Sequence, residues 1–188
     1  MIFDNFIINE EVKKKLFSFY LNKHLPNAFI FHGNDGIGKE AMALEFFALL
    51  NCKNHSKNEV CGNCPSCKKT RILQHELLNI ITPLPRGKSS NKNNSPLDCL
   101  TEKERQSLTT QLSMKSQDPY FKIRIEKANT IIINSIKDIK KNINLSIPDK
   151  CIKLHLIFEA EKLCFPKQEA ANSLLKILEE PKKNNLFI

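Results

Sequence analysis

Long apolar runs are missing from this sequence: no stretch approaches the roughly 20 uncharged residues that a helix needs to cross a bilayer. The first residues, "MIFDNFIINEEVKKK", lack the basic start, the apolar run and the small-residue cleavage site of a secretory signal. Both features argue against a membrane protein and against a secreted one. The sequence predicts a soluble protein that stays in the cytoplasm and has no contact with a membrane.

Acidic residues are in short supply, with 20 Asp and Glu against 29 Lys and Arg, which gives a formal charge of +9. Such a balance is typical of proteins that contact phosphate backbones, but it also arises from lysine-rich genome usage, so direct contact with DNA stays open. With 188 residues the chain is long enough for one sizeable core and too short for the usual multi-domain enzyme. We expect one domain with a small appendage.

Glycine is scarce too, and three of the five glycines lie close together in "HGNDGIGKE", at Gly33, Gly36 and Gly38. With Lys39 they fit the phosphate-binding pattern Gly-x-x-x-x-Gly-Lys-Ser/Thr. In that pattern backbone N–H groups cradle phosphates, the lysine reaches the terminal phosphates and the hydroxyl binds Mg²⁺. Glu40 stands where the hydroxyl belongs. The loop therefore indicates an ATPase, a damaged nucleotide site, or a turn that only looks like one.

Apolar periodicity predicts strands that alternate with helices. Residues 28–31 form a short apolar run before the glycines, typical of a buried parallel strand, and a helix is expected directly after the loop at residues 39–50. The other elements are expected as helices at 10–23, from about 133 to 143 and at 167–180, and as strands at 151–160 and 185–188. This alternation predicts an α/β fold with a parallel sheet flanked by helices. Because the last strand is cut short, residues 1–188 are expected to be a piece of a longer chain.

Residues 82–119 interrupt this alternation with a segment rich in Pro, Ser, Asn and Lys, which we interpret as a polar insertion or a mobile loop. Its second half, residues 100–114, could form a surface helix. Residues 84–98 offer almost no apolar side chain to anchor them, so we expect them to be mobile. The expected sites of first cleavage by a protease are Arg86, Lys88 and Lys92.

Four of the seven cysteines, Cys52, Cys61, Cys64 and Cys67, are spaced C-x8-C-x2-C-x2-C. Each two-residue spacing brings two thiolates onto one tight turn, and four thiolates complete the tetrahedral shell of a structural Zn²⁺. Burial in a core is the alternative, but these cysteines lie among Lys, Asn, Gly and Ser, where nothing apolar is expected to cover them. Residues 51–68 are therefore predicted to form a small zinc-binding module with no open position for catalysis.

His55 lies in the same segment and could compete as a ligand, although four cysteines already close the shell. The remaining cysteines are isolated, and each is interpreted as a single buried or surface thiol. They are Cys99, Cys151 and Cys164.

The phosphate loop, the cysteine module after its helix and "AANSLLKILEEP" near the carboxyl end occur together. This combination resembles the clamp-loader ATPase family of bacterial DNA polymerase III over nearly the whole chain. The last stretch is close to that family's Asn-Ala-Leu-Leu-Lys-Thr-Leu-Glu-Glu-Pro signature, whereas Asn27 stands where the family usually has a histidine. The resemblance implies a P-loop NTPase fold of the AAA+ class. Residues 1–188 would be its amino-terminal module and residues 51–68 an inserted zinc module.

The resemblance also implies how the second strand should end. The catalytic members, gamma and tau, end it in Asp-Glu, where the Asp holds Mg²⁺ and the Glu positions the attacking water, whereas this sequence has Phe158 and Glu159. Mg²⁺ in a P-loop NTPase is held by the loop hydroxyl and that aspartate, so Glu40 and Phe158 remove both groups. Glu159 is then expected to be vestigial, and ATP with Mg²⁺ is not expected to bind well. Replacing Glu40 by Thr together with Phe158 by Asp is expected to restore Mg²⁺-dependent binding.

Within the family these departures favour delta-prime, a largely non-hydrolysing member that helps to load the sliding clamp in DNA replication, as part of the polymerase holoenzyme. The implied partners are the gamma/tau and delta subunits and, through the complex, the sliding clamp and primed DNA. A gamma/tau-like ATPase with an unusual Mg²⁺ site is the alternative, because the carboxylate of Glu40 could bind Mg²⁺ itself. A stand-alone zinc-binding nucleic-acid module fits less well, because no aromatic and basic stripe flanks the cysteines.

Overall fold

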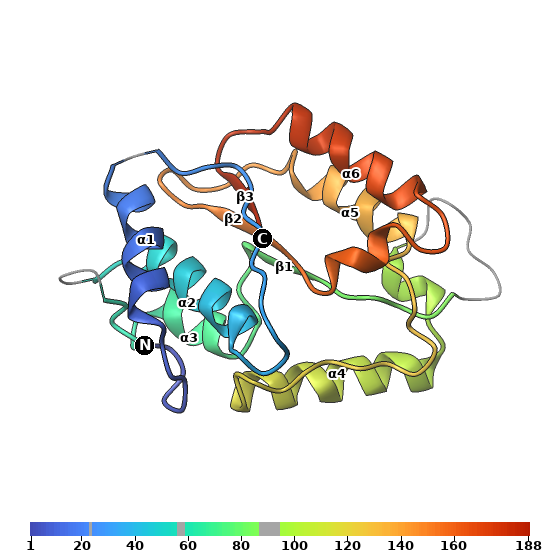
Figure 1. Cartoon of the computed structure of the whole chain (residues 1–188), viewed down its shortest axis with the longest axis horizontal. Helices are drawn as coiled ribbons and strands as arrows, with labels where there is room; N and C mark the ends of the chain where they lie inside the picture. Colours follow the sequence, from blue (N-terminus) through green and yellow to red (C-terminus); the bar gives the residue numbers. More distant parts are fainter. Residues whose placement is uncertain (23, 56–58, 87–94) are drawn as a thin grey trace.

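The structure, a computed structural model, describes residues 1–22, 24–55, 59–86 and 95–188. Helices and strands alternate over much of this part of the chain (Figure 1). The α-helices are α1 (Glu10–Leu21), α2 (Lys39–Asn51), α3 (Pro65–Arg71), α4 (Glu102–Gln117), α5 (Ile133–Asn142) and α6 (Glu169–Glu179). The strands are β1 (Leu78–Ile81), β2 (Lys153–Ile157) and β3 (Asn185–Phe187), and the 3₁₀ helices are η1 (Pro96–Cys99) and η2 (Ala160–Leu163).

The strands form one parallel sheet in the order β1-β2-β3, with β2 in the middle. The strand expected at residues 28–31 contributes a single parallel bridge, between Ala28 and Phe187 of β3. Two backbone hydrogen bonds form this bridge, both at 2.9 Å: the N–H of Phe29 donates to the Phe187 carbonyl, and the N–H of Phe187 donates to the Asn27 carbonyl. Among the described residues the segment pairs with no residue of the sheet other than Phe187, so it stays a bridge. The predicted mixed α/β fold with a parallel sheet is confirmed.

Each face of the sheet is covered by helices and has its own apolar core. On one face, α2 is buried along most of its length and shares a core with Leu154, Leu156 and Phe158. On the other face, α5 and α6 pack together over Ile81 and Phe187. Figure 1 shows α5 and α6 side by side above the sheet, with α1, α2 and α3 gathered on its other side. The division follows from the strand geometry, because successive side chains of a strand point to opposite faces.

The described parts of residues 82–119 contain more regular structure than a polar loop would. Leu84 is buried and pairs through its backbone with Thr130. The surface helix expected at residues 100–114 is α4, which begins at a capping box formed by Thr101 and Glu104. The mobility of residues 84–98 stays a prediction, and two of its three expected cleavage sites, Lys88 and Lys92, lie outside the described residues.

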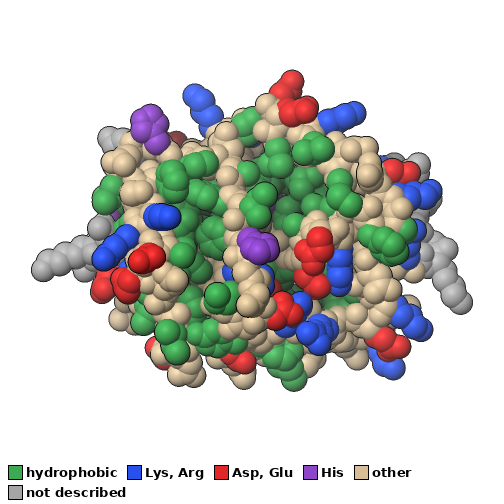
Figure 2. Space-filling model, viewed as in Figure 1, with side chains coloured by type: hydrophobic (Ala, Val, Ile, Leu, Met, Phe, Trp, Pro, Cys, Tyr) green, Lys and Arg blue, Asp and Glu red, His purple; other side chains and the backbone are tan. Residues whose placement is uncertain are grey.

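Among the described residues, none of the helices combines the length and the apolar composition needed to cross a bilayer. Figure 2 shows one face of the molecule, on which acidic and basic side chains lie side by side and apolar side chains gather across the middle. The excess of lysine and arginine therefore forms no continuous basic stripe over the described part of this face.

Candidate functional site

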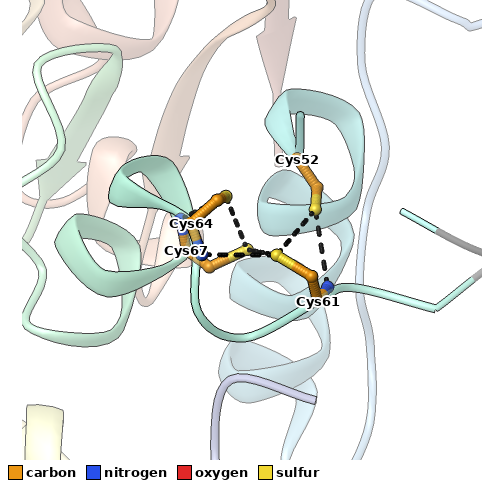
Figure 3. A group of neighbouring side chains, drawn as sticks. All are labelled: Cys52, Cys61, Cys64 and Cys67. Carbon is orange, nitrogen blue, oxygen red and sulfur yellow. Dashed lines mark hydrogen bonds between the residues drawn. The ribbon is translucent and has the colours of Figure 1, made fainter. Parts of the chain in front are cut away.

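The four cysteines of the predicted zinc module come together in the structure (Figure 3). Cys52 caps the carboxyl end of α2, and Cys61 lies in the connection to α3. Cys64 is the N-cap of α3, and Cys67 lies in the first turn of that helix. Pro65 opens α3 at a position where a missing N–H loses no helical partner, so the second C-x2-C spacing starts a helix. The first turn of α3 therefore brings the thiols of Cys64 and Cys67 together.

The distances between the sulfurs match a tetrahedral shell. The Sγ atoms of Cys52 and Cys61 are 3.5 Å apart, those of Cys64 and Cys67 are 3.4 Å apart, and those of Cys61 and Cys67 are 4.0 Å apart. All four sulfurs lie within 4.8 Å of one another. Four thiolates at roughly 2.3 Å from Zn²⁺ would be about 3.8 Å apart. The cysteines therefore fit a structural zinc ion and fill its shell.

Backbone N–H groups point at three of these sulfurs. The N–H groups of Cys61, Cys64 and Cys67 donate to the sulfurs of Cys52, Cys61 and Cys64, at 3.5, 3.3 and 3.5 Å. Burial opposes ionisation of Cys64, but the backbone N–H groups of Cys67 and Lys53 and the neighbouring thiols of Cys67 and Cys61 lower its pKa to about 6. Burial raises the pKa of Cys67. Cys64 is thus the more easily ionised thiol and Cys67 keeps its proton. A zinc ion would bind both as thiolates and displace that proton.

One argument for the zinc module, that nothing apolar would cover its cysteines, is wrong. Cys52, Cys64 and Cys67 are buried and belong to the same apolar core as α2. The module is therefore packed against the fold. His55 points elsewhere, because its Nε2 lies 3.2 Å from the hydroxyl of Tyr20, and the group of metal-ligating side chains among the described residues contains the four cysteines without it.

The glycine loop precedes α2 and has a backbone form that glycine permits. Gly36 and Gly38 have φ angles of 77° and 82°, in the left-handed region. Gly38 is also the N-cap of α2, and a Cβ there would lie 2.5 Å from the ring of Phe6 and 3.1 Å from the ring of Tyr120. Only glycine therefore fits at position 38. Phe6 and Tyr120, to which no sequence pattern pointed, lie against the loop from distant parts of the chain.

The loop lysine is held by the protein itself. The Nζ of Lys39 lies 3.2 and 3.3 Å from the carbonyl oxygens of Gly33 and Asn34, and 3.7 Å from the carboxylate of Asp35. Lys122 binds the same carboxylate at 3.1 Å and thereby lowers the pKa of Asp35. The lysine that would reach terminal phosphates is thus already satisfied, and an anion would compete with Asp35 for it.

Glu40 is also satisfied, by a residue that the sequence analysis missed. Its carboxylate binds the ammonium of Lys115, which comes from α4, 75 residues further along the chain. Lys115 is 1% exposed, and its Nζ also donates to the carbonyl oxygens of Pro119 at 3.2 Å and Phe121 at 2.7 Å. The same Nζ lies 5.6 Å from the centroid of the Phe158 ring. One buried ammonium therefore lies against both residues that replace the expected Mg²⁺ ligands.

Glu159 is tied to its own surroundings. It follows Phe158 at the end of β2 with a φ of 54°, in the left-handed region. Its carboxylate lies 2.9 Å from the Nζ of Lys162 and 3.9 Å from that of Lys122. A cavity of about 520 Å³ lies between this strand end and the glycine loop, and both Lys39 and Lys122 line it. Lys39 and Lys122 share the carboxylate of Asp35, and Lys122 also lies near that of Glu159, so both lysines of the cavity already have a counter-ion.

Known proteins resemble the chain along nearly its whole length. A family model described as "DNA polymerase III, delta subunit" matches residues 8–188. The chain belongs to this family. The resemblance to clamp-loader subunits of DNA polymerase III is thereby confirmed.

Curated relatives include subunits of the same polymerase. The chain is 25% identical over 186 residues to DNA polymerase III subunit tau of Bacillus subtilis (strain 168), covering 99% of the chain and 25% of that protein. It is 36% identical over 59 residues to subunit gamma/tau of Mycoplasma genitalium, covering 31% of the chain and 10% of that protein. Protein STICHEL-like 2 of Arabidopsis thaliana is 36% identical over 67 residues, 35% of the chain and 8% of that protein. The chain thus spans a quarter or less of the length of these relatives.

Proposed function

We propose that the chain is a non-catalytic, delta-prime-like subunit of the DNA polymerase III clamp loader, which helps to load the sliding clamp during DNA replication. The observation that carries this proposal is the ion pair of Glu40 with Lys115 beside the ring of Phe158. In P-loop NTPases a hydroxyl and an aspartate at the positions of Glu40 and Phe158 hold the metal. Here the residues at those two positions contact the ammonium of Lys115. This contact supports a loop that is folded but does not bind Mg²⁺.

The proposal extends to the module and its partners. Residues 1–188 would form an AAA+ module of the P-loop NTPase type, and residues 51–68 an inserted module around a structural zinc ion. Four thiolates fill the zinc shell, so the ion would hold α3 against α2 and take no part in a reaction. The partners would be the gamma/tau and delta subunits in the cytoplasm and, through the complex, the sliding clamp and primed DNA. Glu159 would have no catalytic role, because Lys162 holds its carboxylate.

A gamma/tau-like ATPase is the second candidate, and the names of two relatives favour it. Under this function the carboxylate of Glu40 would ligate Mg²⁺. It would first have to leave Lys115, whose buried ammonium would then lack a counter-ion. Breaking a buried ion pair in this way is strongly unfavourable. The non-catalytic function therefore suits the geometry better.

Reconstitution separates the two functions. Complexes are assembled from this chain and the gamma/tau and delta subunits of the same organism, and ATP hydrolysis is measured with clamp and primed DNA. Lys39→Ala in this chain is expected to leave the hydrolysis rate within about twofold of the unmodified complex. The reason is that Lys39 already binds the loop carbonyls and Asp35. The same substitution at the loop lysine of gamma/tau, the matched control, is expected to abolish hydrolysis.

A complex that assembles normally with Lys39→Ala but loses about tenfold or more of its hydrolysis would contradict the non-catalytic function. That result would favour the ATPase. Size-exclusion chromatography of each complex provides the assembly control, because it separates a loss of chemistry from a loss of the complex.

A further inference from the structure

Three side chains around the glycine loop form a set: Glu40 in the first turn of α2, Phe158 after β2 and Lys115 in α4. The ammonium of Lys115 binds the carboxylate of Glu40 and lies 5.6 Å from the centroid of the Phe158 ring. In P-loop NTPases one cation, Mg²⁺, is held by the residues at the positions of Glu40 and Phe158. In this chain one cation also lies against both positions, and it is an ammonium that the protein itself supplies.

The ammonium of Lys115 has no donor left for a ligand. A protonated lysine offers three N–H groups. Its acceptors here are the carboxylate of Glu40 and the carbonyl oxygens of Pro119 and Phe121. Because Lys115 is 1% exposed, a phosphate oxygen could bind it only by breaking one of these bonds. Mg²⁺ bridges the protein and the phosphates, whereas this ammonium binds the protein alone.

We propose that Lys115 is an internal cation that takes the place of the divalent metal and locks the glycine loop to α4 without nucleotide. The inference rests on the proposed function, because it explains how the site is closed to Mg²⁺. A dication placed beside a buried ammonium would be repelled at short range. An aromatic ring at position 158 suits the ammonium, because ring faces attract cations. Lys115 therefore accounts for the residue types at both altered positions.

The segment that supplies Lys115 also covers the loop. Directly after α4, the ring of Tyr120 lies close to Gly38, and Lys122 binds Asp35 of the loop. Residues 115–122 thus contact the loop and the start of α2 at three points, through the ammonium of Lys115, the ring of Tyr120 and the ammonium of Lys122. In this arrangement α4 and its following turn are a fixed cover that the protein's own charges hold in place.

A double-mutant cycle between Lys115 and Glu40 tests the pairing. Lys115→Met is expected to lower the melting temperature by roughly 5–10 °C, because it leaves a partly buried carboxylate without its counter-ion. Lys115→Met combined with Glu40→Met removes both charges and is expected to recover most of that loss. Lys103→Met, at an exposed position of the same helix, is the matched control and should shift the melting temperature by less than about 2 °C.

The Mg²⁺ dependence of ATP binding tests the replacement of the metal. Glu40→Thr with Phe158→Asp restores both metal ligands but keeps Lys115, so ATP affinity is expected to stay within about twofold with and without Mg²⁺. Adding Lys115→Met to these two substitutions is expected to let Mg²⁺ strengthen ATP binding about tenfold or more. Adding Lys103→Met instead is the matched control and should leave the double variant unchanged, because Lys103 is exposed on α4. This expected result differs from the sequence-based expectation that two substitutions suffice, and the titration decides between them.

The inference is overturned if the double variant already gains the full Mg²⁺ dependence, if the triple variant gains none, or if the effects of Lys115→Met and Glu40→Met simply add. Lys115→Met combined with Glu40→Met carries neither charge, so recovery of folding in this variant is itself the readout where Lys115→Met alone does not fold. The two Mg²⁺ outcomes concern engineered variants and leave the proposed function standing, whereas simple additivity would also remove the ion-pair argument for it. That function fails instead if the unmodified chain binds ATP in a Mg²⁺-dependent manner.

Discussion

Replacing Cys67 with serine is expected to remove the metal from the protein and to lower its melting temperature by roughly 10 °C or more. Cys67 is fully buried, and its sulfur lies 3.4 Å from that of Cys64 and 4.0 Å from that of Cys61. Structural zinc shells of this kind are built from thiolates and imidazoles, so a serine leaves the shell incomplete. Because the cysteines share a core with α2, the loss should also loosen the helix that follows the glycine loop.

Metal analysis and thermal unfolding check this result. The unmodified protein, purified without chelator, is expected to carry about one equivalent of zinc per chain. Cys164→Ser changes an exposed cysteine outside the cluster, so this matched control should keep both the metal and the melting temperature. An unmodified protein that is well folded and free of zinc, with all four cluster thiols open to titration, would refute the zinc assignment.

The fold is expected to lose about 3 kcal/mol of its free energy of unfolding in mild acid because of one buried histidine. His155 is fully buried in β2, its Nε2 lies 3.1 Å from the Oδ1 of Asn185, and its ring stacks on Phe187 with 4.8 Å between centroids. Burial lowers its pKa to about 4 from the ordinary value of 6.5. The unfolded chain therefore binds the proton more readily. Stability that is complete above about pH 6.5 is lost as the pH falls toward about 4.

His155→Gln is expected to remove most of this dependence, because glutamine does not titrate, although it should also lower stability at neutral pH. Urea unfolding at several pH values between about 7 and 4.5 gives the slope. The slope should persist in His24→Gln, a control at an exposed position. Burial also lowers the pKa of His75, which leaves a smaller dependence of the same sign. An unchanged slope in His155→Gln would show that another group is responsible.

Short-range patterns explain why much of the site could be predicted. The cysteine spacing brings the thiols together through local turns and the start of α3. Each of the four sulfurs contacts the sulfur of another cysteine no more than nine residues away. The glycine loop likewise needs only the local left-handed conformations of Gly36 and Gly38. In both cases residue type and spacing determine the geometry.

Lys115 could not be predicted, because its role depends on packing between parts of the chain that are far apart. It lies in α4, a helix that is polar over most of its surface, and lysines on such a helix are normally solvated. Its burial comes with contacts to Glu40, to the ring of Phe158 and to two carbonyl groups in the turn after α4. One signal in the sequence was the pair of departures from the P-loop pattern at Glu40 and Phe158. A carboxylate and an aromatic ring at these two positions both favour a cation nearby.

The polar composition of residues 82–119 was a weaker guide. Scattered apolar side chains such as Leu84, Leu100 and Leu108 are enough to anchor the described parts of this segment, because each of them is buried. Average composition hides such anchors, since a helix like α4 needs only a narrow buried face to dock.

The absence of metal-dependent nucleotide chemistry at the glycine loop is tested most directly by calorimetric titration of the unmodified chain with ATP, in the presence and absence of Mg²⁺. ATP is expected to bind weakly or not at all, with affinities that differ by less than about twofold between the two conditions. The reason is that Lys115 pairs with Glu40 where the metal would be held. Micromolar binding that strengthens about tenfold or more with Mg²⁺ would contradict the non-catalytic role and favour a gamma/tau-like ATPase.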